Sequence, residues 1–475
     1  MDDRRKNYRE WDPERSIQEP VSPRDALPAD DLVFFLLDLI PQLDLSPFHQ
    51  HYAREMRGQP PFDVTMMVVL LVYAYCVGVC SSRKIAAACE RNLAFRAIVG
   101  NDPPDFRTIS DFRKIHLAAF RPLFVEVLRL AGELGMVKLG NVSTDGTKMG
   151  ANASRHKAMS YGYMNKEIKR LEAEVDRLLK QAEELDAEQD AALGSRRGDE
   201  LPDELKRRED RLAKIREAKA RLEAEARATA ADEQSRRDEE QAKRAAEGRQ
   251  RRGKEPAPID PTPDDKAQTN FTDSEAKIMK QSNKGFDYSY NAQAVVDSTA
   301  QIIVAAEVTI AANDKEQAVP MARAALDNLE AAKIERPMGD DGKPAAIPNT
   351  ADAGYFSEKA VNELEHMGID PHIATGRQKH HQTQESAANT PPSAEATVKE
   401  KMREKLRLPA GQALYAARKH IVEPVFGMTK SARGIRKFLL RGLEKVSAEW
   451  QLICLTHNLL KIWRSRKSVA VIPRG

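Results

Sequence analysis

Cysteine is scarce in this chain of 475 residues. The four cysteines, Cys76, Cys80, Cys89 and Cys454, include no CxxC pair and have no matching cluster of histidines. This spacing argues against both a disulfide framework and a zinc site. Reduced thiols in a cytoplasmic protein are the simplest interpretation.

Long apolar runs are also lacking. The most apolar stretch, residues 64–79, is shorter than the ~20 residues that a membrane-spanning helix needs, and Asp63 and Arg83 flank it closely. We therefore expect a buried helix at this position and no membrane partner. The first residues are polar and contain no apolar segment, so we also expect no secretory signal.

Acidic residues are few toward the C-terminal end, although the net charge of the whole chain is only +3. Residues 399–475 contain 18 Lys and Arg against 5 Asp and Glu. A basic segment of this kind favours a polyanionic substrate. A generally basic segment with no specific partner is the alternative.

Three acidic residues stand in settings that could bring them together. Asp145 and Asp352 each end an apolar run, and Glu423 lies in the basic segment. Carboxylates at the ends of neighbouring strands, joined by one from a nearby helix, suit a pair of hard cations such as Mg²⁺. Two such ions about 4 Å apart could hold the attacking and leaving oxygens of a phosphoryl displacement. The trio predicts a nuclease-like strand-transfer site, although each acid alone could be a helix cap or a surface residue.

Residues 31–135 show the pattern of short helices, with a break at 101–104. Thr108 or Ser110 is a possible helix N-cap, and the arrangement is similar to a helix-turn-helix. A small helical bundle whose basic residues are only its solvated surface fits equally well. In the helix-turn-helix interpretation, the residues facing DNA would be Arg107, Arg113, Lys114 and His116.

A coiled-coil pattern follows. Between Ile168 and Leu185, apolar residues alternate spacings of three and four. Breaks at 194–202 precede a second such helix, so we predict an antiparallel coiled-coil hairpin inserted into the sequence. Residues 229–263 lose the apolar positions, and we expect them to be frayed or disordered.

Strand and helix patterns alternate in the remainder. Removing the insertion leaves three strands, a helix and alternating strand–helix units, which predicts an α/β domain with a mixed sheet. The expected elements are strands at 286–296 and 301–310, a helix at 315–333, a strand ending at Asp352, a helix at 357–367 and a strand at 370–374.

Taken together, the motifs resemble those of bacterial insertion-sequence transposases of the DDE type. That family has a ribonuclease-H-like catalytic core, so the resemblance implies an α/β ribonuclease-H-like core with an all-α N-terminal domain. The segments that carry the resemblance, in order, are 142–148, 270–279, 290–295, 351–355, 422–427 and 445–461.

The resemblance also implies a reaction. Asp145, Asp352 and Glu423 would hold two divalent ions, Mg²⁺ or Mn²⁺, with Asp145 on a central strand as the bridging ligand. These ions would serve to cut DNA at the terminal inverted repeats of the element and to join it to target DNA. Such a protein would act as a homodimer or larger assembly, in the bacterial cytoplasm at the nucleoid.

Related transposases place a tyrosine, an arginine and a lysine around the glutamate. Lys430 matches the lysine, whereas Lys419 stands at the arginine position and Ala416 at the tyrosine position. Tyr415 and Arg418 each stand one residue early, about 100° around a helix.

Several neighbours of the glutamate have expected roles. Pro424 should disrupt regular helix directly after it. Asp273, a fourth acid in a matching segment, is expected to serve folding or to support the site rather than to bind metal. The residues expected to contact DNA phosphates here, through salt-dependent rather than sequence-specific contacts, are Lys419, Lys430, Arg433, Arg436 and Lys437.

Two other functions fit the same sequence: a metal-dependent nuclease or resolvase on the same fold, and a catalytically inactive DNA-binding coiled-coil protein derived from a transposon. We expect a flexible loop at 377–398. The predicted domains are a flexible arm (1–30), a helical DNA-binding domain (31–135), a ribonuclease-H-like catalytic domain (136–163 and 264–465), an inserted helical hairpin with a linker (164–263) and a basic tail (466–475).

Overall fold

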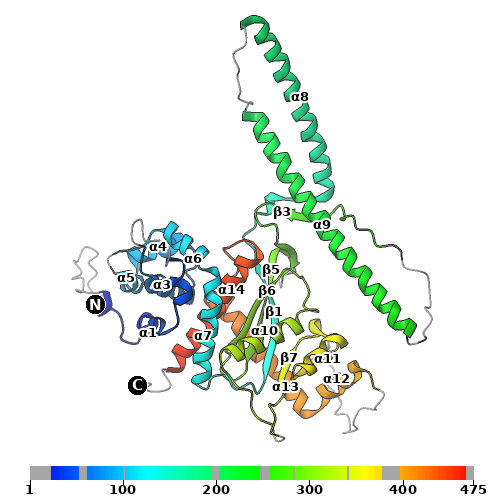
Figure 1. Cartoon of the computed structure of the whole chain (residues 1–475). Coiled ribbons are helices and arrows are strands. Elements are labelled where there is room, and N and C mark those ends of the chain that lie inside the picture. Colours follow the sequence, from blue (N-terminus) through cyan, green and yellow to red (C-terminus); the bar gives the residue numbers. More distant parts are fainter. Residues whose placement is uncertain are drawn as a thin grey trace, which may run out of the picture.

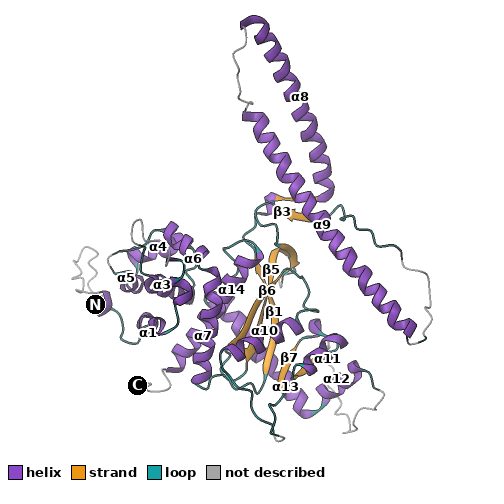
Figure 2. Ribbon diagram, in the orientation of Figure 1, coloured by secondary structure: helices purple, strands orange, loops and turns teal. Residues whose placement is uncertain are grey.

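A mixed sheet lies at the centre of the molecule, helices surround it, and two long helices project from it (Figure 1, Figure 2). The computed structural model describes residues 23–52, 61–100, 102–193, 203–246, 248, 257–281, 284–339, 342–376 and 396–466. Most of the predicted arm, the predicted loop at 377–398 and the predicted basic tail lie outside these residues.

The sheet has six strands, in the order β4-β5-β1-β7-β8, with β6 also paired to β5. β1 is antiparallel to β5 and parallel to β7, and β7 is parallel to β8. β2 and β3 form a separate two-stranded sheet. The strands are β1 Val142–Gly150, β2 Ala158–Ser160, β3 Gln268–Asn270, β4 Lys277–Lys280, β5 Phe286–Asp297, β6 Ile303–Thr309, β7 Ile347–Ala351 and β8 Ile369–Ile373.

The predicted mixed sheet is therefore present. β5 is buried along nearly its whole length, because strands flank it on both sides and helices cover the sheet. The strands β2, β3 and β4 were not predicted, since each is only three or four residues long and shows little apolar alternation.

The N-terminal helices pack onto the rest of the body through one continuous apolar core. Nearly every side chain of α3 is buried, as the run at 64–79 predicted. No helix in the described part of the chain is long and apolar enough to cross a membrane. These helices are α1 Leu32–Leu39, α2 Ser46–His49, α3 Val64–Cys76, α4 Ser82–Arg91, α5 Leu93–Val99, α6 Phe106–Ile115 and α7 Phe120–Glu133.

α14 lies between the N-terminal helices and the sheet. It packs against α3 and α7 on one side and against β6 on the other. Asn458 on this helix donates to Ile303 O and accepts from Ile303 N, which satisfies the open edge of β6. The C-terminal helices are α10 Ala318–Ala331, α11 Glu358–His366, α12 Val398–Arg407, α13 Pro409–Gly427 and α14 Leu443–Arg466.

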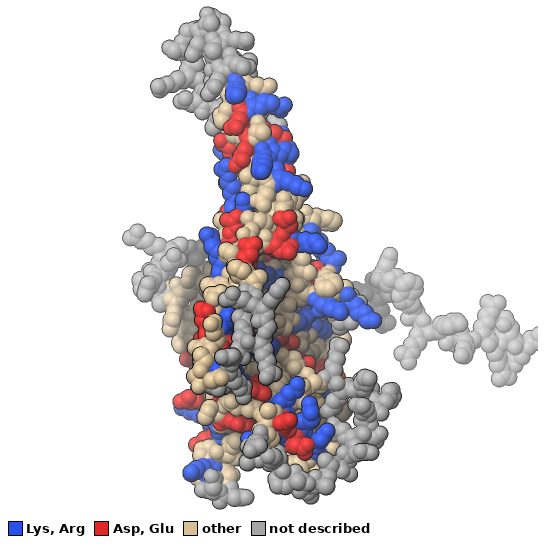
Figure 3. Space-filling model, turned by 90° about the vertical axis from the view of Figure 1, so that its right-hand side faces the viewer, with Lys and Arg blue, Asp and Glu red and all other residues tan. Residues whose placement is uncertain are grey.

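The projecting helices are α8 Tyr161–Leu193 and α9 Asp203–Ala246, which run side by side near the body (Figure 1). The predicted break at 194–202 between them lies outside the described residues. Ion pairs such as Arg216–Glu172 link the two helices, and acidic and basic side chains interleave along their surface (Figure 3). The buried side chains between them include Met164, Ile168, Leu171, Leu212, Ile215 and Leu222.

The expectation of a frayed segment from residue 229 is wrong as far as Ala246, because α9 continues to that residue. Alanine, glutamate and arginine are strong helix formers even without a buried face. Pairs at i,i+4 add support: Arg237 contacts Glu233 at 2.6 Å, and Arg244 contacts Glu240.

Candidate active site

Asp145 and Asp352 lie on neighbouring parallel strands. Asp145 is in β1, and Asp352 directly follows β7. The register of the two strands pairs Ser143 with Thr350, so each acid lies two residues beyond the last printed pair of these strands. The negative charge of Asp352 raises the pKa of Asp145, which shows that the two carboxylates interact. The structure thus brings together two members of the predicted trio.

The Asp145 carboxylate is largely removed from water, with a side chain 20% exposed. Its pKa is raised to about 6, mainly by burial and also by the charges of Asp352 and Asp314. The Arg418 guanidinium, 3.1 Å away, and the Gly146 N–H, 2.8 Å away, act in the opposite direction. Arg418 is therefore the counter-charge of Asp145 in this structure.

Asp314 is an acid of the site that the sequence reasoning missed. Its Oδ1 accepts from Asn291 Nδ2 at 2.6 Å and from Gln293 Nε2 at 2.7 Å, and Lys148 Nζ lies 3.5 Å away. Asp314 follows β6 by five residues, so the rule that found Asp352, an acid soon after a strand, could also have found it.

Glu423 is not brought to the other two acids. Its side chain is exposed, and α13 instead presents Arg418 to Asp145. Five residues further along a helix correspond to about 140° of rotation, which turns Glu423 away from the face that Arg418 occupies. Among the residues that the structure describes, no group of three His, Cys, Asp or Glu is placed to hold a metal ion.

Regular helix is not disrupted directly at Pro424, contrary to the sequence expectation. α13 continues through Pro424 to Gly427 and is followed by a π-helical turn, Met428–Ala432. A proline leaves the carbonyl four residues earlier without its helical donor. Here that carbonyl, His420 O, accepts from Gln301 Nε2 at 2.7 Å, so the missing bond is replaced.

Two residues expected to face DNA on α6 are buried instead. Arg113 donates to Tyr75 Oη at 3.0 Å and to the Cys80 carbonyl at 2.9 Å, and His116 packs against Phe112. Burial lowers the pKa of His116 to about 4, so it is neutral near pH 7. The prediction was wrong for these two because their positions on α6 turn toward the helical core. Arg107 and Lys114 are exposed.

The N-cap of α6 also differs from the expectation. Asp105 is the cap, and its carboxylate accepts from Thr108 N at 2.7 Å. The helix consequently begins before Thr108 and Ser110, the two residues predicted to cap it. An aspartate at this position is among the most favourable helix caps.

The basic residues on α13 and in the segment after it differ in their exposure to solvent. Arg433 is buried and donates to Thr456 Oγ1 at 2.7 Å and to the Ile453 carbonyl at 3.3 Å, so the prediction that it contacts phosphate was wrong. Lys430 is half-buried and is bound to β1. The residues of this set that remain exposed are Lys419, Arg436 and Lys437.

The contacts of Asp273 fit the expectation that it serves folding or supports the site rather than binding metal. It is buried and accepts from Tyr290 Oη at 2.8 Å. Its second contact is the Gly442 N–H, at 3.3 Å. Tyr290 lies opposite Met149 near the end of β1, and Gly442 precedes α14, so neither partner belongs to the Asp145 site.

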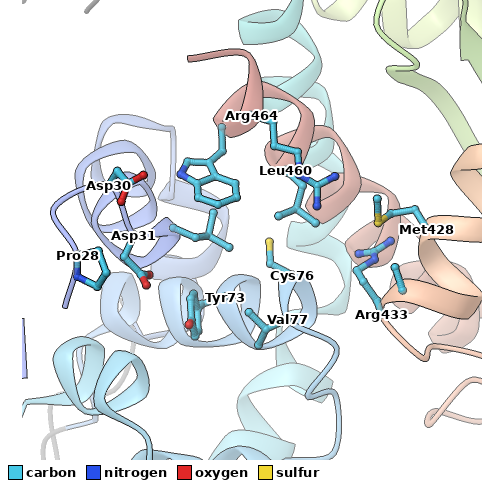
Figure 4. Close-up of a pocket in the computed structure, with 13 residues that line it drawn as sticks. Pro28, Asp30, Asp31, Tyr73, Cys76, Val77, Met428, Arg433, Leu460 and Arg464 are labelled. Atoms are coloured by element: carbon cyan, nitrogen blue, oxygen red, sulfur yellow. The ribbon is translucent and has the colours of Figure 1, made fainter. Parts of the chain in front are cut away.

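A hollow of about 440 Å³ lies elsewhere, between the N-terminal helices and α14 (Figure 4). Tyr73 and Cys76 of α3 line one wall, and Arg433 and Leu460 line the opposite side. None of the acids around Asp145 lines it. The hollow is therefore a feature of the junction between the helical region and the core, separate from the candidate active site.

Two family models match the chain. One, described as "Transposase domain (DUF772)", covers residues 21–115. The other, described as "Transposase DDE domain", covers residues 377–463. These two matches support an insertion-sequence DDE transposase. The second match includes Arg418, Glu423 and Lys430. No curated protein and no solved structure matches the chain.

The donor chemistry of this site fits a hard divalent cation of the kind that DDE transposases generally use. Asp145, Asp352 and Asp314 interact electrostatically, and burial holds the pKa of Asp145 high. The buried oxygen Oδ1 of Asn291, beside Asp314, has no hydrogen-bond partner. A cation here would compensate charges that Arg418 and Lys148 now neutralise only in part.

The raised pKa of Asp145 predicts a pH dependence of stability in the metal-free protein. The carboxyl has an ordinary pKa of 3.8 and a pKa of about 6 in the folded protein. The folded state therefore takes up this proton first as pH falls from 7 to 5. The free energy of unfolding should rise by about 1 kcal/mol over this range from this group.

Urea unfolding in EDTA at pH 7, 6 and 5 measures this contribution. Other buried acids, such as Glu307, also have raised pKa values, so the readout is the difference between the unmodified protein and Asp145→Asn. The variant should lack about 1 kcal/mol of the increase. An identical pH response in both proteins would contradict the assignment.

Proposed function

We propose that the transposase cuts DNA at the ends of its element and joins them to target DNA, using a ribonuclease-H-like core. The observation that carries this proposal is the pairing of Asp145 with Asp352 in a chain that matches two transposase domains. The strand pattern supports it, because three antiparallel strands, β6, β5 and β1, are followed by the parallel strands β7 and β8.

In this proposal Asp145 and Asp352 hold divalent cations, two Mg²⁺ or Mn²⁺ ions. Bound ions of this kind activate the attacking hydroxyl and stabilise charge on the phosphate. Glu423 is the proposed third carboxylate. Because Arg418 lies on the Asp145-facing side of α13, this role requires the ion pair between Arg418 and Asp145 to open. The site would then exchange one positive counter-charge for another.

The proposed DNA contacts are the exposed basic residues. Arg436 and Lys437 adjoin the end of β1, where Gly150 N donates to Arg436 O at 3.1 Å, and Lys419 lies on α13. Arg107 and Lys114 on α6 would bind DNA from the helical region. These residues supply salt-dependent contacts to phosphate rather than base readout.

The assembly is part of the same proposal. Two element ends must meet, so a homodimer or larger complex is expected, acting in the cytoplasm at the nucleoid. We retain the domain division proposed from sequence, with α8 and α9 as a coiled-coil hairpin inserted into the catalytic domain. The hairpin is available for contact between subunits, since it projects from the body (Figure 1).

The test uses the purified full chain and a plasmid that carries its gene with the natural flanking DNA. With Mg²⁺ we expect cleavage at the element boundaries and joining of the released ends to a second plasmid, and EDTA should abolish both. Cleavage without joining would favour the nuclease. DNA binding without cleavage in Mg²⁺ or Mn²⁺ would favour an inactive DNA-binding protein, which the ion pair between Arg418 and Asp145 would then explain.

A further inference from the structure

Lys148 lies inside the acidic site rather than on its rim. Its side chain is only 19% exposed, and its Nζ is 3.5 Å from Asp314 Oδ1. Burial lowers the pKa of Lys148, whereas Asp314, Asp145 and Asp352 act in the opposite direction. The ammonium group is therefore paired with Asp314, it feels the charges of Asp145 and Asp352, and it remains partly open to solvent.

The position of Asp314 is fixed by the sheet. Asn291 and Gln293, both buried in β5, donate their amide N–H groups to the same oxygen of Asp314. Gly146 leaves room for this arrangement, because a Cβ there would lie 2.9 Å from Asp314 Oδ1 and 2.9 Å from Asn291 Oδ1. These contacts make Asp314 a rigid support for a cation rather than a mobile surface acid.

The backbone of Lys148 is held from the other side. Lys430 donates to the Lys148 carbonyl at 2.7 Å and to Thr147 Oγ1 at 2.6 Å. The backbone of Lys148 is thus held by Lys430, in the turn that follows α13, and its ammonium group is held by Asp314. Fixed donors of this kind are what stabilises charge that develops during a reaction.

We propose that Lys148 is a further catalytic residue that contacts the phosphate under attack, and that Asp314 is the residue that positions it. This inference rests on the proposed function. Phosphoryl transfer leaves negative charge on the non-bridging oxygens, and a compact ammonium group can neutralise it. Lys148 is suited to this because its ammonium is paired with Asp314, lies within the electrostatic influence of Asp145 and Asp352, and is itself not a metal ligand. Asp314 keeps the ammonium in place before DNA arrives.

The experiment measures single-turnover cleavage of the flanked plasmid at saturating protein, with DNA affinity measured separately in EDTA. Lys148→Met should slow cleavage roughly 100-fold, with little change in DNA affinity or in thermal unfolding. Lys148→Arg should recover part of the rate, because it restores the positive charge. Lys359→Met is the matched control, since that side chain is 87% exposed on α11.

Asp314→Asn tests the positioning role. It should slow cleavage about 10-fold, and the double variant with Lys148→Met should be no slower than Lys148→Met alone, because Asp314 acts through Lys148. Multiplied effects in the double variant would overturn this role. If Asp145→Asn is inactive while Lys148→Met stays within about threefold of the unmodified protein, this inference alone fails. If Asp145→Asn cleaves normally, the proposed function fails.

Discussion

Asp145→Asn is expected to lower the rate of DNA cleavage at least about 100-fold, with DNA affinity little changed. Asparagine keeps the shape of the side chain but removes the negative charge, and with it the strongest ligand for a divalent cation. Asp145 lies in β1 at the centre of the sheet, where the backbone is held in place, so no neighbouring side chain can move in to replace the lost carboxylate. Single-turnover cleavage of the flanked plasmid in Mg²⁺ measures the effect.

Asp327→Asn is the matched control, because Asp327 is exposed on α10. This substitution makes the same chemical change at a position away from the site. Asp352→Asn should resemble Asp145→Asn.

Glu423→Gln tests whether α13 rearranges on the way to the active state. A loss as large as that of Asp145→Asn would show that α13 rearranges on the way to the active state, since Glu423 is exposed here. Full activity of Asp145→Asn would remove the carboxylate pair from the mechanism.

The predictable part of the site is the part that strand geometry determines. Asp145 and Asp352 each end an apolar run, and the parallel pairing of β1 with β7 places these two segments next to each other, although β1 continues past Asp145 to Gly150. The pairing of Lys148 with Asp314 lay beyond this reasoning, although Asp314, like Asp352, comes soon after a strand. Their contact depends on the side-chain amides of Asn291 and Gln293 in the middle of β5, and sequence spacing does not show which face of a strand they share.

The helix register was less predictable. Lys419 matched the arginine position by counting from Glu423, but Arg418 makes the contact with Asp145. One residue changes direction by about 100° on a helix, so an error of one position exchanges a buried contact for an exposed one. Pro424 added a second error, because a tertiary donor, Gln301, replaces the lost helical bond. Such a replacement depends on a residue more than a hundred positions away.

Basic character was likewise a poor guide to DNA contact, since Arg113 and Arg433 are both buried at the junction between the helical region and the core. Arg433 approaches α3 closely near the hollow in Figure 4. Gly78 permits this approach: its φ is +79°, and a Cβ there would collide with the Arg433 carbonyl. These arginines join parts of the fold, and composition alone cannot separate that role from phosphate binding.

Arg113→Met is therefore expected to destabilise the protein by about 3 kcal/mol or more. Arg113 on α6 donates to Tyr75 Oη, and Tyr75 on α3 donates to Glu449 on α14 at 3.1 Å. Glu449 also accepts from the Leu439 and Leu440 N–H groups, each at 2.9 Å. Burial raises the pKa of Glu449, and the charge of Arg113 opposes that rise. Methionine fills the space but leaves a buried carboxylate without its counter-charge.

Urea unfolding of the full chain measures this loss, and Lys114→Met is the matched control. Lys114 is the exposed neighbour, paired with Asp111 at 3.1 Å, so its replacement should change stability by less than about 0.5 kcal/mol. Adding Glu449→Gln to Arg113→Met should recover part of the loss, because it removes the unpaired charge. If Arg113→Met instead leaves stability intact and weakens DNA binding, the arginine faces DNA after all. The coupling energy between Arg113 and Glu449 measures how much this buried network adds to the apolar packing of α6 and α3 against α14.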